Sequence, residues 1–121
     1  MTEIVTGNGF ELAVDLLRDR KTFTIPAQSV LQAAVVSRDN KALLAGPVNI
    51  NLSAPGTDTA ASLVIVQIPA ALTGQITRYG PAKLEIKMTA NPGTPEEFSH
   101  PSWFVDVLIV KSQIPAVPSG L

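Results

Sequence analysis

The sequence predicts an all-β domain, an immunoglobulin-like antiparallel β-sandwich of about seven strands. Apolar and polar residues alternate with a period of two in "FELAVDLL", "PVNINLS" and "KLEIKMT", a pattern typical of strands with one buried and one wet face. Other runs are rich in Val and Ile, which favour a pleated sheet. Turn signals such as "RDRK" and "SAPGTD" separate these runs at intervals close to those of a sandwich. The chain has no cysteine, so membership of the antibody superfamily, with its disulfide and partnered Trp, is not implied.

The first half of the chain contains four of the expected strands. Residues 9–17 form the first, because Phe, Leu and Val alternate there with Glu, Ala and Asp. Residues 22–25 form a short second strand after the polar turn "RDRK". Residues 29–37 are the continuous apolar run "SVLQAAVVS", which predicts a strand covered on both faces or one whose second face meets another subunit. Residues 43–53 end in the alternating "PVNINLS".

The second half contains three more strands and one short helical turn. Two of these strands, residues 61–68 and 102–111, are continuous apolar runs like 29–37. Their apolar stretches read "SLVIVQIP" and "WFVDVLIVK". Residues 76–90 include the alternating "KLEIKMT". The helical turn is expected in "PAALTGQI", with Pro69 near its first position and Gly74 ending it.

A chain of 121 residues is about one domain with a single core. We expect residues 9–111 to form the β-sandwich, residues 1–8 a flexible N-terminal lead-in, and residues 112–121 a Pro-rich C-terminal tail or docking arm. The start lacks the basic and apolar regions of a secretory signal, and no apolar run approaches the roughly 20 residues that span a bilayer. The sequence therefore predicts a soluble protein without a membrane partner.

The composition points to a surface that is partly covered by partners. Only 16% of the residues are charged while 45% are hydrophobic, against about a quarter charged in an average soluble domain. The formal net charge is −1, and the nine basic residues are scattered along the chain. No cationic face is expected to neutralise a phosphate backbone, so nucleic acid is not an expected partner.

The single histidine, His100, is the strongest candidate for catalysis, and its setting argues against that role. Glu96, Glu97, Ser99 and Ser102 lie within four positions of it and superficially supply a carboxylate and a nucleophile. All of them belong to one short connection between strands, whereas the members of a triad normally come from separate elements that fix each partner. We therefore expect a solvated loop residue and no enzyme, and we keep a hydrolase that uses His100 as an alternative.

The sequence predicts neither a metal site nor a cofactor. One His, no Cys and no dense acidic run leave too few ligands for zinc or calcium. Gly7 and Gly9 in "TGNGFE" precede a strand rather than a helix, and no Lys-Ser/Thr follows, so they do not make a phosphate loop.

Aromatic residues and the Pro-rich end supply the candidate interface. Trp103 and Phe104 are adjacent and must face opposite sides of a strand, with Trp103 expected in the core. An exposed Phe104 would form an aromatic patch with Phe98. If Trp103, Phe104 or Tyr79 were exposed, a carbohydrate or cell-surface ligand-binding module would be the alternative function. The candidate interface residues are Phe98, Phe104, Ile114, Pro115, Val117 and Pro118.

The order of these patterns resembles the immunoglobulin-like domains of tailed-phage virions, in particular the N-terminal domain of the baseplate upper protein family. The similarity lies in "FELAVDLL", "FTIP", "SVLQAAVVSRDNKALLAGPVNI", "SLVIVQIPAALTGQITRYGPAKLEIKM" and "WFVDVLIV", and spans about residues 9–111. Its specific matches are the turn at Asp39 and Asn40, the strand 63–68 ending at Pro69, then Thr73, Gly80 and the alternating Leu84, Glu85 and Ile86.

The resemblance implies a non-catalytic structural virion protein, made soluble in the host cytoplasm and present in several symmetry-related copies. Because the chain has one domain and no receptor-binding or coiled-coil extension, baseplate, tail, head-tail neck and capsid-decoration roles all remain open. The implied partners are other virion proteins and further copies of this chain. Contacts are expected at sheet edges, at the apolar outer positions of strands 61–68 and 102–111, and at the termini.

Overall fold

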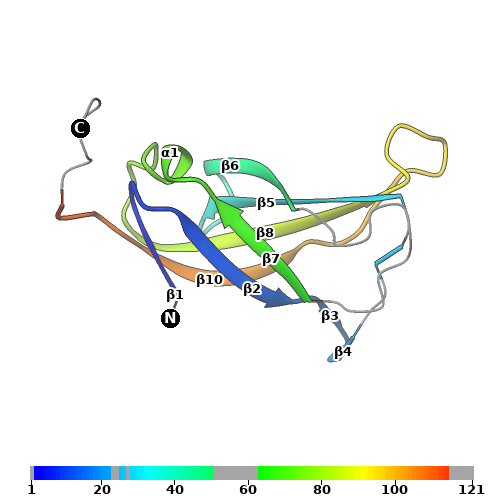
Figure 1. Ribbon diagram of the computed structural model, residues 1–121. Helices are drawn as coiled ribbons and strands as arrows, with labels where there is room; N and C mark the ends of the chain where they lie inside the picture. Colours follow the sequence, from blue (N-terminus) through cyan, green and yellow to red (C-terminus); the bar gives the residue numbers. More distant parts are fainter. Residues whose placement is uncertain (1, 23–24, 27, 51–62, 115–121) are drawn as a thin grey trace.

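The computed structural model describes residues 2–22, 25–26, 28–50 and 63–114. These residues form β-strands and one short helix, so the all-β prediction is confirmed. The strands make a curled mixed sheet with a smaller antiparallel pair in front of it (Figure 1).

The main sheet has six strands in the order β1-β10-β8-β5-β6, with β9 pairing with β8 beyond this path. The β1–β10 pair is parallel and the other pairs are antiparallel. The bounds are β1 (Thr2–Val5), β5 (Ser29–Ser37), β6 (Leu43–Ile50), β8 (Gly80–Ala90), β9 (Phe98–Ser99) and β10 (Trp103–Val110).

The remaining strands form two small antiparallel pairs. β2 (Phe10–Asp15) pairs with β7 (Leu63–Ile68), and β3 (Leu17–Arg18) forms a short hairpin with β4 (Lys21–Thr22). The helix α1 (Ala70–Thr73) directly follows β7. Pro69 caps its first turn and Gly74 its last, as the sequence predicted.

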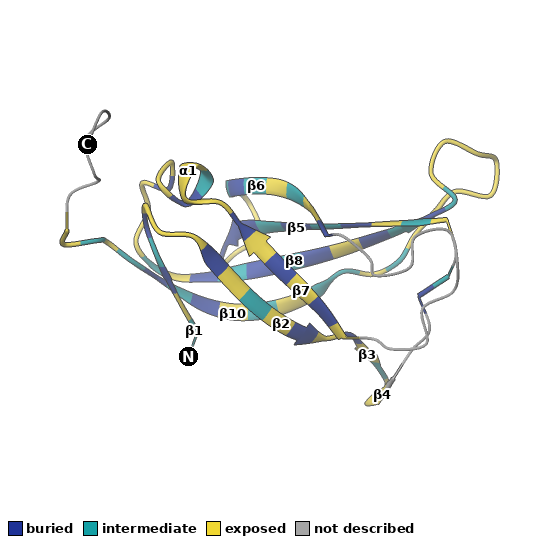
Figure 2. Cartoon of the chain, viewed as in Figure 1, coloured by how far each residue is buried: buried dark blue, intermediate teal, exposed yellow. Residues whose placement is uncertain are grey.

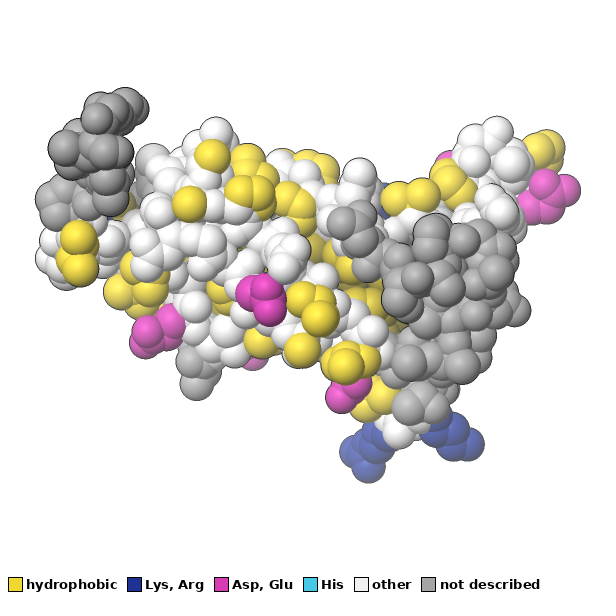
Figure 3. Space-filling model, viewed as in Figure 1, with side chains coloured by type: hydrophobic (Ala, Val, Ile, Leu, Met, Phe, Trp, Pro, Cys, Tyr) yellow, Lys and Arg dark blue, Asp and Glu magenta, His cyan; other side chains and the backbone are white. Residues whose placement is uncertain are grey.

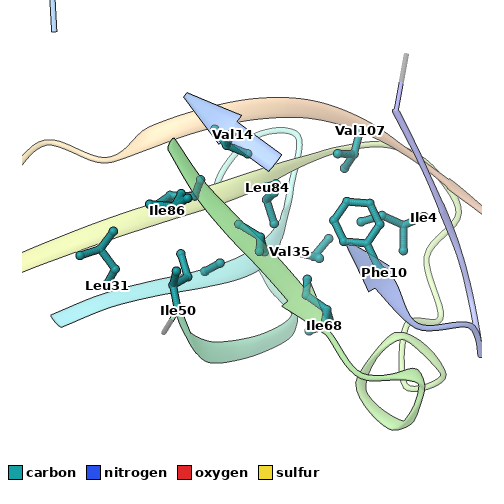
Figure 4. Close-up of a cluster of buried hydrophobic side chains, with 14 of the residues drawn as sticks. Ile4, Phe10, Val14, Leu31, Val35, Ile50, Ile68, Leu84, Ile86 and Val107 are labelled. Atoms are coloured by element: carbon teal, nitrogen blue, oxygen red, sulfur yellow. The ribbon is translucent and has the colours of Figure 1, made fainter. Parts of the chain in front are cut away.

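The core lies between the β2–β7 pair and the main sheet, and the period-two patterns place it there. Figure 2 shows buried and exposed residues alternating along β2, β7 and β8. Figure 4 shows the two layers interdigitating. One cluster of buried apolar side chains contains Leu84 and Ile86 from β8, Ile68 from β7, Phe10 from β2 and Val35 from β5. Burial of this kind is the main favourable contribution to folding.

The N-terminal segment differs from the expected flexible lead-in. Residues Thr2–Val5 are strand β1, paired in parallel with β10 from Thr2 beside Val107 to Val5 beside Val110. Ile4 is fully buried in the core. Four residues are too few to show a reliable period, and a parallel partner more than 100 positions away leaves no local signal.

The strand predicted over 29–37 coincides with β5, and the other strand predictions are correct in place but differ at their ends. The first expected strand, 9–17, divides after Asp15, because Leu16 turns into the core before β3 begins. The strand expected over 76–90 begins only at Gly80. Parts of three predicted strands, at residues 23–24, 51–53 and 61–62, lie outside the described residues.

The β6 edge of the main sheet carries a local irregularity. The β5–β6 register shifts between Ala33 and Val35, opposite Gly46, whose φ is +98°. A Cβ on Gly46 would lie 3.2 Å from the Ala33 carbonyl oxygen, so glycine is required both by the positive φ and by this close approach. Pro47 follows Gly46. Proline has no N–H to donate, and an edge strand tolerates it because N–H groups on the outer side of that strand have no neighbouring strand to bond.

Candidate assembly surfaces

The outward side of the β2–β7 pair exposes two large apolar side chains, Leu63 and Ile65. We call it the β2–β7 face; it consists of Glu11, Ala13, Asp15, Leu63, Ile65 and Gln67. Leu63 is 54% exposed and Ile65 is 52% exposed. Figure 3 shows hydrophobic side chains gathered across this front side of the molecule, with acidic side chains beside them.

The β2–β7 face follows from a strand that is apolar on both sides. Val64, Val66 and Ile68 alternate into the core, so Leu63 and Ile65 must point outward. On β2 the same alternation exposes Glu11, Ala13 and Asp15, which pair with Gln67, Ile65 and Leu63 respectively. The Gln67 side chain donates a hydrogen bond to the Glu11 carboxylate at 2.8 Å. The face therefore carries Leu63, Ile65 and Ala13 as its apolar part, with Glu11 and Gln67 at one end and Asp15 beside Leu63 at the other.

A pocket lies at the end of the main sheet where β8 begins. We call it the terminal pocket; its volume is about 450 Å³. It opens to solvent between the β5–β6 turn, the segment before β8 and the end of β10. It is lined by Ser37, Arg38, Asp39, Leu44, Arg78, Pro81 and Ile109.

Hydrogen bonds to Ser37 and Asp39 fix the turn that forms one wall of the terminal pocket. The Ser37 hydroxyl donates to the Asp39 carboxylate at 2.6 Å and accepts from the backbone N–H groups of Lys41 and Ala42 at 3.1 and 3.0 Å. Asp39 accepts a further bond from the Lys41 N–H at 3.1 Å. The hydrogen bond from Ser37, then the one from Lys41 and the positive charge of Arg78, lower the pKa of Asp39 below its ordinary value.

Trp103 and Phe104 face opposite sides of β10, as predicted. Trp103 packs against the core, its Nε1 donates to the Leu17 carbonyl at 3.0 Å, and the Arg18 guanidinium lies 3.7 Å from the centre of its ring. Phe104 is 46% exposed, with the Lys83 ammonium 5.4 Å from its ring centre. The Arg18 guanidinium thus covers one face of the Trp103 ring.

The exposed aromatic residues do not come together. Phe98 pairs with Ala90 on β8 and Phe104 with Glu85, five positions apart, so the two rings belong to opposite faces of the sheet. The single aromatic patch expected from Phe98 and Phe104 is therefore not formed. Tyr79 is 53% exposed and immediately precedes β8. It lies about 20 Å along the strand from Glu85, the residue that pairs with Phe104.

The structure describes the C-terminal tail only as far as Ile114. Ile114 is 81% exposed. The other candidate interface residues of the tail, Pro115, Val117 and Pro118, lie outside the described residues.

The groups around His100 are engaged in separate interactions. Its backbone N–H donates to the Met88 carbonyl at 3.0 Å, and its ring contacts the Phe98 ring edge-on with centroids 4.8 Å apart. The Ser102 hydroxyl donates to the Glu85 carboxylate at 2.6 Å, and Glu97 accepts from the Gly93 N–H at 3.1 Å. Ser102 and Glu97 are thus each bonded to other residues.

Within the described ranges, no group of three or more His, Cys, Asp and Glu side chains could hold a metal ion. Among the described residues, no helix is long and apolar enough to cross a bilayer. The most notable site that sequence reasoning missed is the terminal pocket, because Arg38 and Arg78 are 40 positions apart and only the sheet brings them to one cavity.

Searches with this chain matched no protein-family model, no curated protein and no solved structure.

Proposed function

We propose that this chain is a non-catalytic structural protein of a tailed-phage virion that acts through contacts with neighbouring protein chains. In this proposal the main sheet and the β2–β7 pair are the two layers of an immunoglobulin-like sandwich. The protein is made in the host cytoplasm and enters the particle in several copies as a baseplate, tail, head-tail neck or capsid-decoration component.

The observation that carries the proposal is the exposure of Leu63 and Ile65 on the outward side of β7, in the β2–β7 face. Each side chain is about half exposed, and burying the remaining half contributes about 1 kcal/mol per residue. A regular strand pair holds them in fixed positions on one face, which suits shape-complementary packing on another protein better than binding of a small ligand. The polar residues at the two ends of the face correspond to the rim of such a contact.

The resemblance to tailed-phage domains supplies the setting, and the β2–β7 face fits the expected apolar outer positions of strand 61–68. A protein with this role needs area and shape at its surface rather than titratable groups. Together these points favour assembly over catalysis as the function.

The test is incorporation into particles. Cells that carry the gene are induced to release particles, which are purified on a density gradient and analysed by quantitative mass spectrometry. We expect the wild-type chain in stoichiometric, multi-copy amounts, and a strong loss of incorporation for the variant Leu63→Asp/Ile65→Asp. Leu43→Asp, at an exposed leucine on β6 that is 59% accessible, is the matched control and should be incorporated normally.

Circular dichroism and thermal unfolding of each purified variant check that the fold is retained. Absence of the wild-type chain from purified particles would overturn the proposal. If the Leu63→Asp/Ile65→Asp variant is incorporated as well as the wild type, the β2–β7 face is not an assembly contact.

A further inference from the structure

The two ends of β8 carry surfaces of opposite charge. The terminal pocket lies at its beginning, where Gly80 pairs with Ile109. The β8–β9 loop, residues 91–97, follows its end at Ala90. The strand has 11 residues, so the two ends are about 33 Å apart and cannot touch within one molecule.

The terminal pocket is a basic cavity with an apolar floor. Arg38 and Arg78 line it, both are exposed, and neither forms an ion pair with another described residue. The acidic group in the lining, Asp39, is already engaged by the Ser37 hydroxyl and the Lys41 N–H. Arg78 also attracts the Asp39 carboxylate, but both guanidinium groups are exposed and can contact a carboxylate from outside. The apolar lining consists of Leu44, Pro81 and Ile109.

The β8–β9 loop is acidic, ordered and followed by an exposed aromatic ring. Backbone hydrogen bonds from Thr94 to Asn91 and from Glu97 to Thr94, at 3.3 and 3.1 Å, hold the loop in shape. Glu96 and Glu97 are both exposed, and Phe98 directly after them is 58% exposed. Figure 3 shows acidic side chains projecting from this loop at the far right of the molecule.

We propose that the β8–β9 loop of one copy enters the terminal pocket of a second copy, with Glu96 paired to Arg38 and Arg78 and Phe98 packed on the apolar lining. The inference rests on the proposed function, which requires several copies, and names the contact that joins them. Planar guanidinium groups recognise carboxylates by paired, charge-assisted hydrogen bonds, which set direction as well as attraction.

A contact between two different ends of the same chain is heterologous, so it does not close on itself as a two-fold dimer does. Repeated, it produces a ring when the rotation per copy closes and a filament when it does not. Either product places identical subunits in a head-to-tail array, with the β2–β7 face of each copy left for contact with other proteins.

The experiment uses charge reversal and its rescue. The pocket variant is Arg38→Glu/Arg78→Glu and the loop variant is Glu96→Lys/Glu97→Lys. The control variant, Arg20→Glu/Lys21→Glu, makes the same charge change as the pocket variant but at the β3–β4 hairpin. All are full-length chains, checked for fold by circular dichroism and studied by sedimentation velocity over concentrations to about 1 mM.

We expect the wild-type and control chains to self-associate with increasing concentration, and to do so less as salt rises. The pocket and loop variants should each have a dissociation constant at least about 100-fold higher, because like charges then meet at the contact. An equimolar mixture of the two variants should associate again, since each basic end finds an acidic one. The chain that carries both reversals should also associate with itself.

Wild-type chains that remain monomeric over this range would overturn the inference, as would variants that associate as the wild type does. Failure of the mixture to associate, with both variants folded, would do the same. Self-association that survives both charge reversals but is lost in Leu63→Asp/Ile65→Asp would refute the head-to-tail contact while leaving the proposed function intact. The particle-incorporation test decides the proposed function independently of this result.

Discussion

The hydroxyl of Thr73 is the buried polar group whose removal gives the sharpest test of the fold. Thr73 has no exposed surface. Its Oγ1 donates to the Asn8 carbonyl at 2.7 Å and accepts from the Gly7 N–H at 3.1 Å. These two hydrogen bonds hold the β1–β2 turn against α1. They therefore also help to position β1 beside β10.

The substitution Thr73→Val keeps the shape of the side chain and removes both hydrogen bonds. Each bond contributes about 1 kcal/mol to the free energy of unfolding, so the loss is about 2 kcal/mol. The unfolding entropy of a chain of 121 residues is about 0.25 kcal/mol per kelvin, which converts the loss to a Tm decrease of about 8 °C. Thr73→Ser keeps the hydroxyl and loses a methyl group, which corresponds to about 1 kcal/mol and 4 °C.

The assay is differential scanning calorimetry of the wild type, the two Thr73 variants and a control variant at one pH and one concentration. Thr94→Val is the matched control, because the Thr94 hydroxyl donates to the Asn91 carbonyl at 2.8 Å on the exposed β8–β9 loop. Its Tm should stay within about 2 °C of wild type. A Thr73→Val chain that melts no lower than the control, or higher than Thr73→Ser, would refute the assignment of the hydroxyl as a structural hydrogen-bonding centre.

Three further predictions test other parts of the structure. Ile4→Ala should lower the free energy of unfolding by about 2–5 kcal/mol in chemical denaturation, because Ile4 is fully buried; a change below about 0.5 kcal/mol would restore the view of residues 1–8 as a flexible lead-in. Ser37→Ala should raise the pKa of Asp39 toward its ordinary value in a carboxyl NMR titration, because the Ser37 hydrogen bond is the main cause of its lowering. A carboxyl group with a lowered pKa in the folded state stabilises the fold at pH values above its ordinary pKa. That stabilisation is lost as the pH falls through the folded-state pKa, so the loss of stability in acid should be smaller in the variant. Arg18→Ala should shift the Trp103 fluorescence maximum to longer wavelength, since the guanidinium lies 3.7 Å from the ring centre; an unchanged spectrum would contradict that stacking.

The limits of sequence-based prediction are clearest in the candidate surfaces. Leu63 and Ile65 lie on a strand whose two-sided apolar pattern already indicated an outward contact. Phe98 and Phe104 were expected to share a patch, yet the register against β8 puts them on opposite faces. Register between strands depends on the loop that joins them, and the long connection before β10 gives no fixed count from which it could be derived.

The sequence by itself determined the all-β class, the positions of the long strands, the helical turn at 70–73 and the opposite orientations of Trp103 and Phe104. All of these depend on neighbours one to four positions apart, which a single chain displays directly. Only the tertiary structure decided that residues 2–5 form a parallel strand on β10 and that Arg38 and Arg78 line one pocket. These are pairings between residues 40 to more than 100 positions apart, and they form because the whole core buries its apolar surface at once.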